Sequence, residues 1–439
     1  MRLSPEALQQ ARLDWNLKTL VTDYQKFGNS RAAWDGPATR ALTEFAQMRA
    51  GTADSDEPGS EIISTNCSAA IDAGCKDPMV RYLYIKFSMS QTNSPQAFLD
   101  AFTDDQDDLQ NSDYSPIRKF YVSLRSFQQF TYTHGYGKNV DYTVGIQMMN
   151  DARTDLVATL NDKTTPPEEV YDACNEYLYV LPGDIQQFHN YYDPIEGPLL
   201  ANWPDEPTSW LLKGKAFDLM AWIYRGQGAA DLVSKDGWKG FKDSLAVEEK
   251  ALNRAWKLNP TDARIADQMI GVALGLEKAR DQMELWFKRA MDNDPNDYTA
   301  CKSKLNYLDA HWYGSVQDML DFGRECVQNT NWGGTVPLIL VDAHYRIYNM
   351  FIDPSERSNY WQRPDVWADV SSAYERYLHD HPDDLQQIAY YANYADDAQQ
   401  WNKLNQLIPK VSPNYYSLFG GADEFQRLAQ VAKERADQR

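Results

Sequence analysis

The chain has 439 residues, 43% apolar and 24% charged, a balance typical of a folded globular protein rather than a disordered one. Lys and Arg number 43 and Asp and Glu number 63, so the formal net charge is −20. This charge argues against nucleic acids and anionic membranes as partners, because their phosphates carry the same sign. No stretch approaches the roughly 18 consecutive apolar residues that a membrane span needs.

The N-terminal residues from Met1 to Glu6 lack the apolar core of a signal peptide. We therefore expect a cytoplasmic protein if this N-terminus is native, and a periplasmic or secreted one if a leader has been removed. Proline directly after a capping residue or glycine predicts the start of a helix, because the N–H that proline lacks has no partner there. Five such pairs precede stretches with apolar residues at helical spacing: Ser4-Pro5, Gly36-Pro37, Asp77-Pro78, Ser94-Pro95 and Ser115-Pro116.

Two segments interrupt the helical pattern. The residues between Ala50 and Glu61 have no apolar period and predict an exposed loop. The segment from Asp193 to Pro207 contains four prolines, so we expect that it cannot continue a helix and place the main boundary there. The resulting division is an N-terminal helical hairpin in 1–50, a helical region in 61–192, a tetratricopeptide-like repeat core in 208–330 and C-terminal helical repeats in 331–439.

A repeat is visible in the second half. The tetrapeptide Asn259-Pro260-Thr261-Asp262 recurs as Asp294-Pro295-Asn296-Asp297, 35 residues later, close to the period of about 34 residues of tetratricopeptide units. His381-Pro382-Asp383-Asp384 resembles a more degenerate copy. Between the first two copies, Gly271 is expected to let two helices approach closely. Because no hairpin buries its apolar face alone, we predict an all-α fold of stacked antiparallel helical hairpins that form an α-solenoid.

Five cysteines are too few and too scattered to form a disulfide framework in a chain of this size. Cys301 and Cys326 lie equally far from a turn predicted at 312–314. Antiparallel helices would bring their sulfurs to one level, either as a disulfide in an oxidising compartment or as two neighbouring buried thiols. Cys67 and Cys75 would be about 12 Å apart on a continuous helix, beyond disulfide reach unless the helix ends at Gly74.

Four segments in the second half each contain a tryptophan: Ala221-Trp222-Ile223-Tyr224-Arg225-Gly226, Trp238-Lys239-Gly240-Phe241, Ala255-Trp256-Lys257-Leu258-Asn259-Pro260 and Trp312-Tyr313-Gly314-Ser315. They resemble a bacterial family of tetratricopeptide-like proteins of unknown function over about residues 208–330. The segments Asp23-Tyr24, Trp34-Asp35 and 73–78 give a weaker match near the N-terminus. The resemblance implies a helical-repeat architecture, often in exported proteins, and implies no catalytic residue.

Two clusters of histidine or acidic residues contain side chains of the types that bind metal ions. His379 and His381, with Asp383 and Asp384, combine suitable ligand types, but two residues of separation makes the imidazoles diverge on a helix. A helix end with solvated polar side chains is favoured. The run 104–108, Asp-Asp-Gln-Asp-Asp, lacks the Gly and distal Glu of a calcium loop and predicts a solvated acidic helix face.

The sequence contains no G-x-S-x-G, H-E-x-x-H, G-x-x-x-x-G-K-[ST] or Cys-x-x-Cys motif. We therefore predict no catalytic, cofactor-binding or metal-binding residue, and no cofactor. Aromatic residues make up 13% of the chain, including 27 Tyr, and such residues suit interfaces. Most of them are expected in the core; the surface candidates are Trp203, Trp210, Tyr390, Tyr391 and Tyr394.

The functional hypothesis is a non-catalytic protein-binding or assembly scaffold, whose partner is another protein or a second copy of the chain. The alternative is a carbohydrate-active helical enzyme with two carboxylates and aromatic platforms, or a glycan-binding module without chemistry. The enzyme predicts a deep cleft with paired carboxylates about 5 to 10 Å apart, one of them with a raised pKa.

Overall fold

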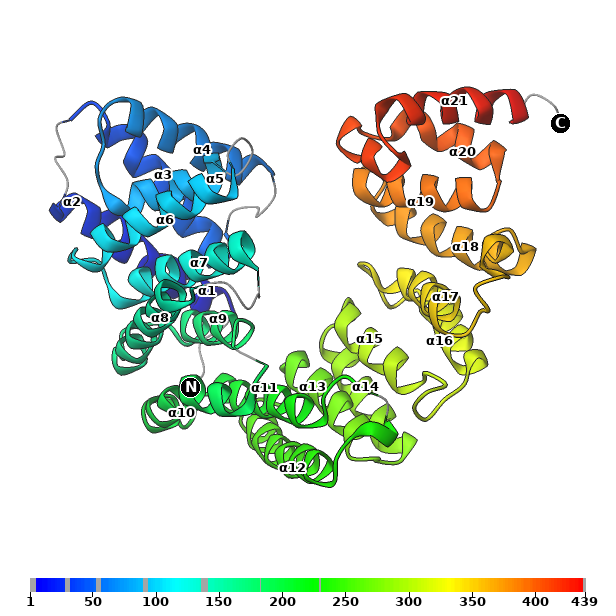
Figure 1. Cartoon of the computed structure of the whole chain (residues 1–439), viewed down its shortest axis with the longest axis horizontal. Coiled ribbons are helices and arrows are strands. Elements are labelled where there is room, and N and C mark those ends of the chain that lie inside the picture. Colours follow the sequence, from blue (N-terminus) through cyan, green and yellow to red (C-terminus); the bar gives the residue numbers. More distant parts are fainter. Residues whose placement is uncertain are drawn as a thin grey trace. The chain divides into compact units, whose positions relative to one another are not determined.

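The structure is a computed structural model, and it describes residues 5–27, 32–52, 57–89, 94–135, 141–181, 183–228 and 230–436. All regular structure in these ranges is helical, so the predicted all-α class is confirmed (Figure 1). The chain divides into two compact units, unit 1 from Met1 to Leu258 and unit 2 from Asn259 to Arg439. The division falls inside the segment 208–330; the four segments proposed from the sequence stay a prediction.

Unit 1 contains twelve labelled α-helices within its described residues. They are α1 (Pro5–Leu17), α2 (Asp23–Phe27), α3 (Asp35–Ala50), α4 (Glu57–Asp72), α5 (Pro78–Ser88), α6 (Pro95–Gln110), α7 (Pro116–His134), α8 (Thr143–Asn161), α9 (Pro167–Leu178), α10 (Ile185–Asn202), α11 (Pro207–Arg225) and α12 (Lys235–Leu258). A π-helical turn, Lys18–Thr22, joins α1 to α2.

Unit 2 continues the pattern with helices of similar length. They are α13 (Ala263–Gly275), α14 (Arg280–Asn293), α15 (Tyr298–Tyr307), α16 (Val316–Gln328), α17 (Ile339–Met350), α18 (Pro364–Asp380), α19 (Leu385–Asp397), α20 (Trp401–Leu407) and α21 (Ala422–Ala436). Short 3₁₀ segments at Val336–Leu338, Arg357–Asn359, Ile408–Lys410 and Pro413–Phe419 link some of them.

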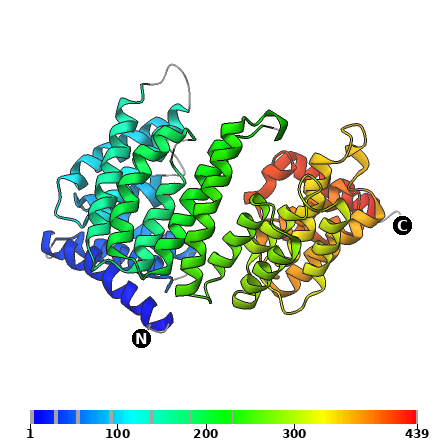
Figure 2. The same ribbon diagram turned by 90° about the horizontal axis from the view of Figure 1, so that it is seen from below.

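Within each unit most consecutive helices pack against each other as hairpins, and several helices two apart in the sequence also touch. In unit 1, α1 contacts α3, α8 contacts α10, and α9 contacts α11; in unit 2, α13 contacts α15, and α15 contacts α17. This pattern places odd-numbered and even-numbered helices in two adjoining layers. Figure 2 shows the long green pair α11 and α12 side by side. Stacking of neighbouring hairpins within each unit therefore buries the apolar faces, as predicted.

The proline rule locates helix starts correctly. Helices α1, α5, α6 and α7 begin at proline, and α3 begins two residues before Pro37. The Asp77 side chain accepts a hydrogen bond from Met79 N at 2.9 Å, which satisfies an amide at the start of α5. The loop predicted before Glu61 is shorter than expected, because α4 already begins at Glu57; residues 53–56 lie outside the described residues.

The last aspartate of each repeated tetrapeptide caps a helix. Asp262 accepts from Arg264 N at the start of α13, Asp297 from Ala300 N at the start of α15, and Asp384 from Gln387 N at the start of α19. A proline two residues earlier stops the preceding helix, and the aspartate then satisfies an amide of the next one. The repeated motif is thus a helix-to-helix turn.

The prediction that the segment beginning at Asp193 cannot continue a helix is wrong. Helix α10 continues to Asn202 through Pro194 and Pro198. Pro194 has no N–H to donate to the carbonyl of Asn190, four residues earlier. The guanidinium of Arg153, on α8, donates to that carbonyl at 3.1 Å instead. Packing between α8 and α10 therefore compensates for a bond that the proline removes.

The expected role of Gly271 is also wrong. A Cβ atom at Gly271 would have nothing within 4 Å, and the residue is exposed on α13. The close approach occurs elsewhere in unit 2: a Cβ at Gly323, on α16, would lie 2.8 Å from the backbone Cα of Leu340. The sequence pattern does not reveal which face of a helix its neighbour covers.

We expect Gly271→Ala to raise the free energy of unfolding by about 0.5–1 kcal/mol, because alanine loses less backbone entropy in a helix and meets no neighbour here. Gly323→Ala should lower it by about 1–2 kcal/mol, because its methyl group collides with backbone that cannot rotate away. Urea denaturation followed by circular dichroism measures both. Equal effects of the two substitutions would contradict this account of the packing.

No helix in the described part of the chain combines the length and apolar character needed to cross a membrane.

Candidate interaction surface

The two tryptophans beside the proline-rich segment serve its packing. Trp203 donates from its indole N–H to the carbonyl of Leu160 at 3.1 Å. Trp210 donates to the carbonyl of Pro204 at 2.8 Å. Both side chains are half-buried. The Trp203 indole thus bonds the last turn of α8, and the Trp210 indole bonds the connection between α10 and α11. Their availability to a partner stays a prediction.

The three tyrosines of α19 that were predicted to lie at the surface differ in their solvent exposure. Tyr391 is buried, with 1% exposure, and its ring stacks on that of Tyr374 with centroids 4.8 Å apart. It belongs to the core, because α18 covers this side of α19. Tyr390 is 37% exposed, and Tyr394 is half-buried with its ring 4.9 Å from Trp361. Only Tyr390 and Tyr394 therefore reach the surface.

Tyr390 and Tyr394 belong to a larger group formed by three successive odd-numbered helices of unit 2. Figure 1 shows α15, α17 and α19 in succession along this unit. We call the group the Tyr–Asp surface, and its members are Tyr298 of α15, Asp342 and Tyr345 of α17, and Tyr390, Tyr394 and Asp397 of α19. Their mutual electrostatic influence shows that they are neighbours: the Tyr394 hydroxyl is affected by four of the others.

Four members, Tyr298, Asp342, Tyr345 and Asp397, were not predicted from the sequence. They come from α15, α17 and α19, and no motif connects positions so far apart in the chain. The Tyr298 hydroxyl donates a hydrogen bond to the Asp342 carboxylate, which ties α15 to α17. Tyr345 is 57% exposed, so its ring is available to a ligand.

Crowding disfavours the charged form of the carboxylates on this surface. Burial raises the pKa of Asp342, although its hydrogen bond from Tyr298 and the charge of Lys302 act in the opposite direction. Burial also raises the pKa of Asp397, and the neighbouring Asp396 raises it further. Among the described residues, Asp396 and Asp397 make no ion pair and accept no hydrogen bond from a side chain. A cation brought to this surface would therefore meet carboxylates without a positive partner.

Two cysteines of unit 2 lie on the consecutive helices α15 and α16. Cys301 of α15 and Cys326 of α16 are both fully buried free thiols. The Cys326 thiol is hydrogen-bonded to Cys301, and burial raises its pKa well above the ordinary value. Cys301 also contacts the sulfur of Met291 at 3.7 Å. Whether the pair oxidises in an oxidising compartment stays a prediction, which thiol titration with and without reductant tests.

The second cysteine pair lies at the end of α4. The helix ends at Asp72, and Gly74 follows with φ 97°, a conformation that favours glycine. Cys67 and Cys75 are buried free thiols. Burial raises the pKa of Cys67 to about 12, and Cys75 adds to this shift. Both groups are protonated at neutral pH and are therefore poor nucleophiles.

The histidines and aspartates at the end of α18 make local contacts. His379 contacts Asp380 at 2.8 Å, and Tyr377 donates to Asp384 at 2.7 Å. Asp384 also caps α19. Within the ranges that the structure describes, no group of three or more His, Cys, Asp or Glu side chains is placed to hold a metal ion.

The acidic run 104–108 is only partly solvated, which corrects the prediction. Asp105 is 1% exposed and accepts from Arg81 of α5 at 3.0 Å, because the α5–α6 packing covers it. Burial raises its pKa to about 7. Burial likewise raises the pKa of Asp155, 9% exposed on α8, to about 6. These carboxylates resemble catalytic acids in pKa alone, since a sugar ring has no access to either position.

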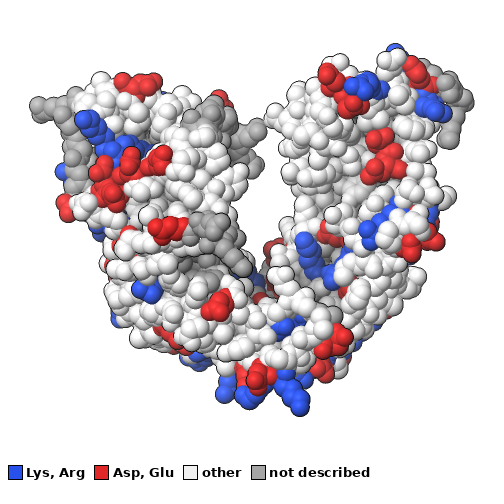
Figure 3. Space-filling view, in the orientation of Figure 1, with Lys and Arg blue, Asp and Glu red and all other residues white. Residues whose placement is uncertain are grey.

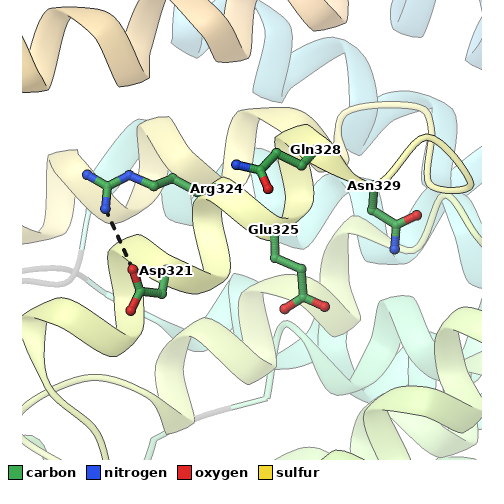
Figure 4. A pocket seen from close by; sticks show the side chains of 5 residues that line it. All are labelled: Asp321, Arg324, Glu325, Gln328 and Asn329. Carbon is green, nitrogen blue, oxygen red and sulfur yellow. Dashed lines mark ion pairs between the residues drawn. The ribbon is translucent and has the colours of Figure 1, made fainter.

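A surface hollow of about 430 Å³ lies along α16 (Figure 4). Its lining is Asp321, Arg324, Glu325, Gln328 and Asn329, which come from this one helix and the residue that follows it. Arg324 lies 3.6 Å from Asp321 and also pairs with Asp369 of α18 at 2.7 Å. Arg324, the one basic residue of this lining, is therefore already paired. The lining also comes from a single helix end, whereas binding clefts usually combine groups from several elements.

Charged side chains form small groups of both signs on the visible face of the molecule, with wide uncharged areas between them (Figure 3). The net charge of −20 is therefore distributed and does not produce one continuous acidic field on that face.

The fold and these surfaces define an all-helical repeat protein. A search of family models found no match, and no curated protein sequence matched either. Among solved structures, the human IFIT1 dimer with m7Gppp-AAAA is similar at 10% identity with a TM-score of 0.27, covering 99% of this chain and 96% of that chain. A monomeric mutant of IFIT1 with Gppp-AAAA gives 11% identity and a TM-score of 0.26 with the same coverage. Scores this low support no conclusion about the present chain.

Proposed function

We propose that the chain is a non-catalytic protein-binding or assembly scaffold, and that the Tyr–Asp surface of unit 2 binds a Lys- or Arg-bearing segment of a partner protein. One observation carries the proposal: the exposed Tyr345 and Tyr390 and the carboxylate of Asp397 all lie close enough to the Tyr394 hydroxyl to raise its pKa, and Asp397 has no ion-pair partner among the described residues. Tyrosine faces attract cations, and unpaired carboxylates add a charge-assisted hydrogen bond.

The net charge of the chain favours a basic segment of a partner protein over a second copy of the chain as the ligand. The net charge of −20 attracts a basic segment at long range, whereas a second copy of the chain brings the same sign. A bound cation would also offset the crowding that raises the pKa of Asp342 and Asp397. Binding should therefore release protons and weaken as the pH falls toward the range in which these carboxylates become protonated.

We also propose that the chain is related to the bacterial tetratricopeptide-like family that its motifs resemble. The supporting observation is that aromatic residues of the first two motifs pack together at the α11–α12 hairpin. The ring centroid of Phe241 lies 5.3 Å from that of Trp222 and 5.7 Å from that of Trp238. The motifs thus mark a structural contact and imply no reaction.

The test uses the full chain and a labelled peptide of alternating arginine and serine, with fluorescence anisotropy as the measurement. We expect Tyr345→Ser combined with Asp397→Asn to weaken binding roughly tenfold, because an exposed aromatic ring and an unpaired carboxylate are removed together. Tyr132→Ser is the matched control: Tyr132 is 76% exposed on α7 of unit 1 and should leave affinity unchanged.

An acidic peptide of alternating glutamate and serine should not bind. If the double substitution and the control bind the basic peptide equally, only the net charge of the chain attracts it and the proposed surface is wrong. Analytical ultracentrifugation of the chain without peptide tests whether a second copy of the chain binds this surface instead. Self-association that the double substitution abolishes would assign the surface to a second copy instead.

A further inference from the structure

A second cluster of charged side chains belongs to unit 1, whereas the Tyr–Asp surface belongs to unit 2. Five odd-numbered helices contribute to it, α1, α3, α5, α7 and α9. We call it the Arg–Glu cluster, and its members are Arg12, Arg49, Lys86, Arg118, Arg125, Glu169, Asp172 and Glu176. Charged residues this crowded are rare inside a protein unless their charges are balanced.

Glu169, in the first turn of α9, is the centre of the inner part. It has no solvent exposure. Its Oε1 accepts from Arg12 Nε at 2.7 Å and from Asn16 Nδ2 at 2.8 Å, and its Oε2 accepts from Arg49 Nη2 at 2.6 Å. Although burial alone would raise its pKa, the charges of the neighbouring arginines lower it to about 2. Glu169 is therefore ionised at all ordinary pH values.

Arg118 lies deepest in the cluster, with 2% exposure. Its Nη2 donates to Asn16 Oδ1 at 2.6 Å and to Thr19 Oγ1 at 2.8 Å, which are neutral acceptors. Its Nε and Nη1 have no acceptor among the described protein groups. Burial lowers the pKa of Arg118 to about 10, with the charge of Glu169 opposing that shift. The inner part therefore contains three cations, Arg12, Arg49 and Arg118, and two carboxylates, Glu169 and Asp172.

The outer part of the cluster is not balanced. Glu176 accepts from Arg125 Nη2 at 2.5 Å and lies 4.0 Å from Arg49 Nη1. Lys86 of α5 is close to the same three groups. The outer part adds the two cations Lys86 and Arg125 against Glu176 alone, so over the whole cluster five cations face three carboxylates, an excess of two positive charges. The outer part is also the accessible one, since the side chains of Arg125 and Glu176 are 31% and 29% exposed.

Lys86 makes no ion pair or hydrogen bond with any described residue. Its ammonium lies 5.5 Å from the ring centroid of Phe45 and 5.3 Å from that of Phe87. Burial first, and then the charges of Arg125 and Arg49, lower its pKa to about 8, although the charge of Glu176 acts in the opposite direction. A largely buried ammonium beside two guanidinium groups lacks the anion that normally accompanies such a group.

We propose that the outer part of the Arg–Glu cluster, between Lys86, Arg49 and Arg125, binds the phosphate group of a ligand. A phosphate carries a charge of about −1.5 to −2 at neutral pH, which matches the excess of two positive charges. A carboxylate would neutralise only half of that excess. Guanidinium groups match phosphate oxygens geometrically, because two parallel N–H donors engage two oxygens.

The experiment titrates the full chain with inorganic phosphate and with phenyl phosphate by isothermal titration calorimetry, at constant ionic strength of about 0.15 M. Acetate, a monoanion, is titrated in parallel. We expect saturable binding of one phosphate group and roughly tenfold weaker binding or none for acetate. Tighter binding of phenyl phosphate assigns the site to a phosphorylated ligand, and equal binding assigns it to free phosphate. Affinity should fall below about pH 6, where phosphate becomes a monoanion.

Lys86→Met is the test variant, because methionine keeps the apolar stem between the two phenylalanine rings. It should weaken phosphate binding roughly tenfold. The control is Lys239→Met on α12, an exposed lysine paired with Asp243 at 2.6 Å, and it should bind as the wild type does. Absence of saturable heat with phosphate overturns the proposal, as does equal binding by Lys86→Met and the wild type.

Discussion

Glu169→Gln should lower the free energy of unfolding by about 3–5 kcal/mol, the usual cost of leaving buried charges without their partner. Glu169 is wholly buried, and both of its oxygens accept from guanidinium groups, those of Arg12 and Arg49. Glutamine keeps the shape and one acceptor oxygen, but it removes the negative charge. Urea denaturation at neutral pH measures the loss.

The pH dependence gives an independent check of the same carboxylate. The folded-state pKa of Glu169, about 2, lies below its ordinary value of 4.5. The stabilisation is therefore complete above pH 4.5 and is lost as the pH falls from there toward 2. The wild type should approach the stability of Glu169→Gln over this range. Glu61→Gln, an exposed position on α4, is the control and should change stability little.

Lys86→Met should have the opposite sign and stabilise the protein in phosphate-free buffer. The pKa of Lys86 falls from 10.5 to about 8, mainly through burial and then through Arg125. Allowing for partial solvent access, this corresponds to roughly 2–3 kcal/mol that the charged ammonium costs the folded state at neutral pH. Removing the ammonium removes that cost.

The sign of the pH effect follows from protonation. Between pH 8 and 10.5 the unfolded chain keeps the Lys86 proton that the folded chain has released, so wild-type stability rises with pH in this window. The advantage of Lys86→Met should therefore be full below pH 8 and absent above 10.5. Calorimetric melting of both proteins across this range is the measurement. A difference that does not change with pH would mean that Lys86 acts through packing alone.

Local chemistry made several helix starts predictable. Proline after a capping residue begins α5, α6 and α7, and the repeated tetrapeptide supplies the caps of α13, α15 and α19. These features involve residues within one turn of each other, so the sequence contains all the interacting groups. The level at which Cys301 and Cys326 meet was predictable for a similar reason, since only the length of one hairpin was needed.

Features that depend on contacts between hairpins were missed. Pro194 is tolerated within α10 because Arg153, on another helix, donates to the carbonyl that the proline leaves without a donor. Gly271 and Gly323 look alike in the sequence, but a neighbouring backbone covers only the second. Tyr391 was expected at the surface beside Tyr390, and α18 buries it.

Short amphipathic helices joined by capped turns were predictable from the amino-acid sequence, because they depend on interactions between near neighbours in the chain. Which polar residues meet depends instead on the packing of one hairpin against another. Arg12, Lys86 and Glu169 have the spacing of ordinary solvated charges, and Tyr298 and Asp397 belong to no motif. These residues become neighbours because stacked hairpins bring successive odd-numbered helices together within each unit. Burial and the neighbouring charges in that layer then shift the pKa values of Glu169 and Lys86.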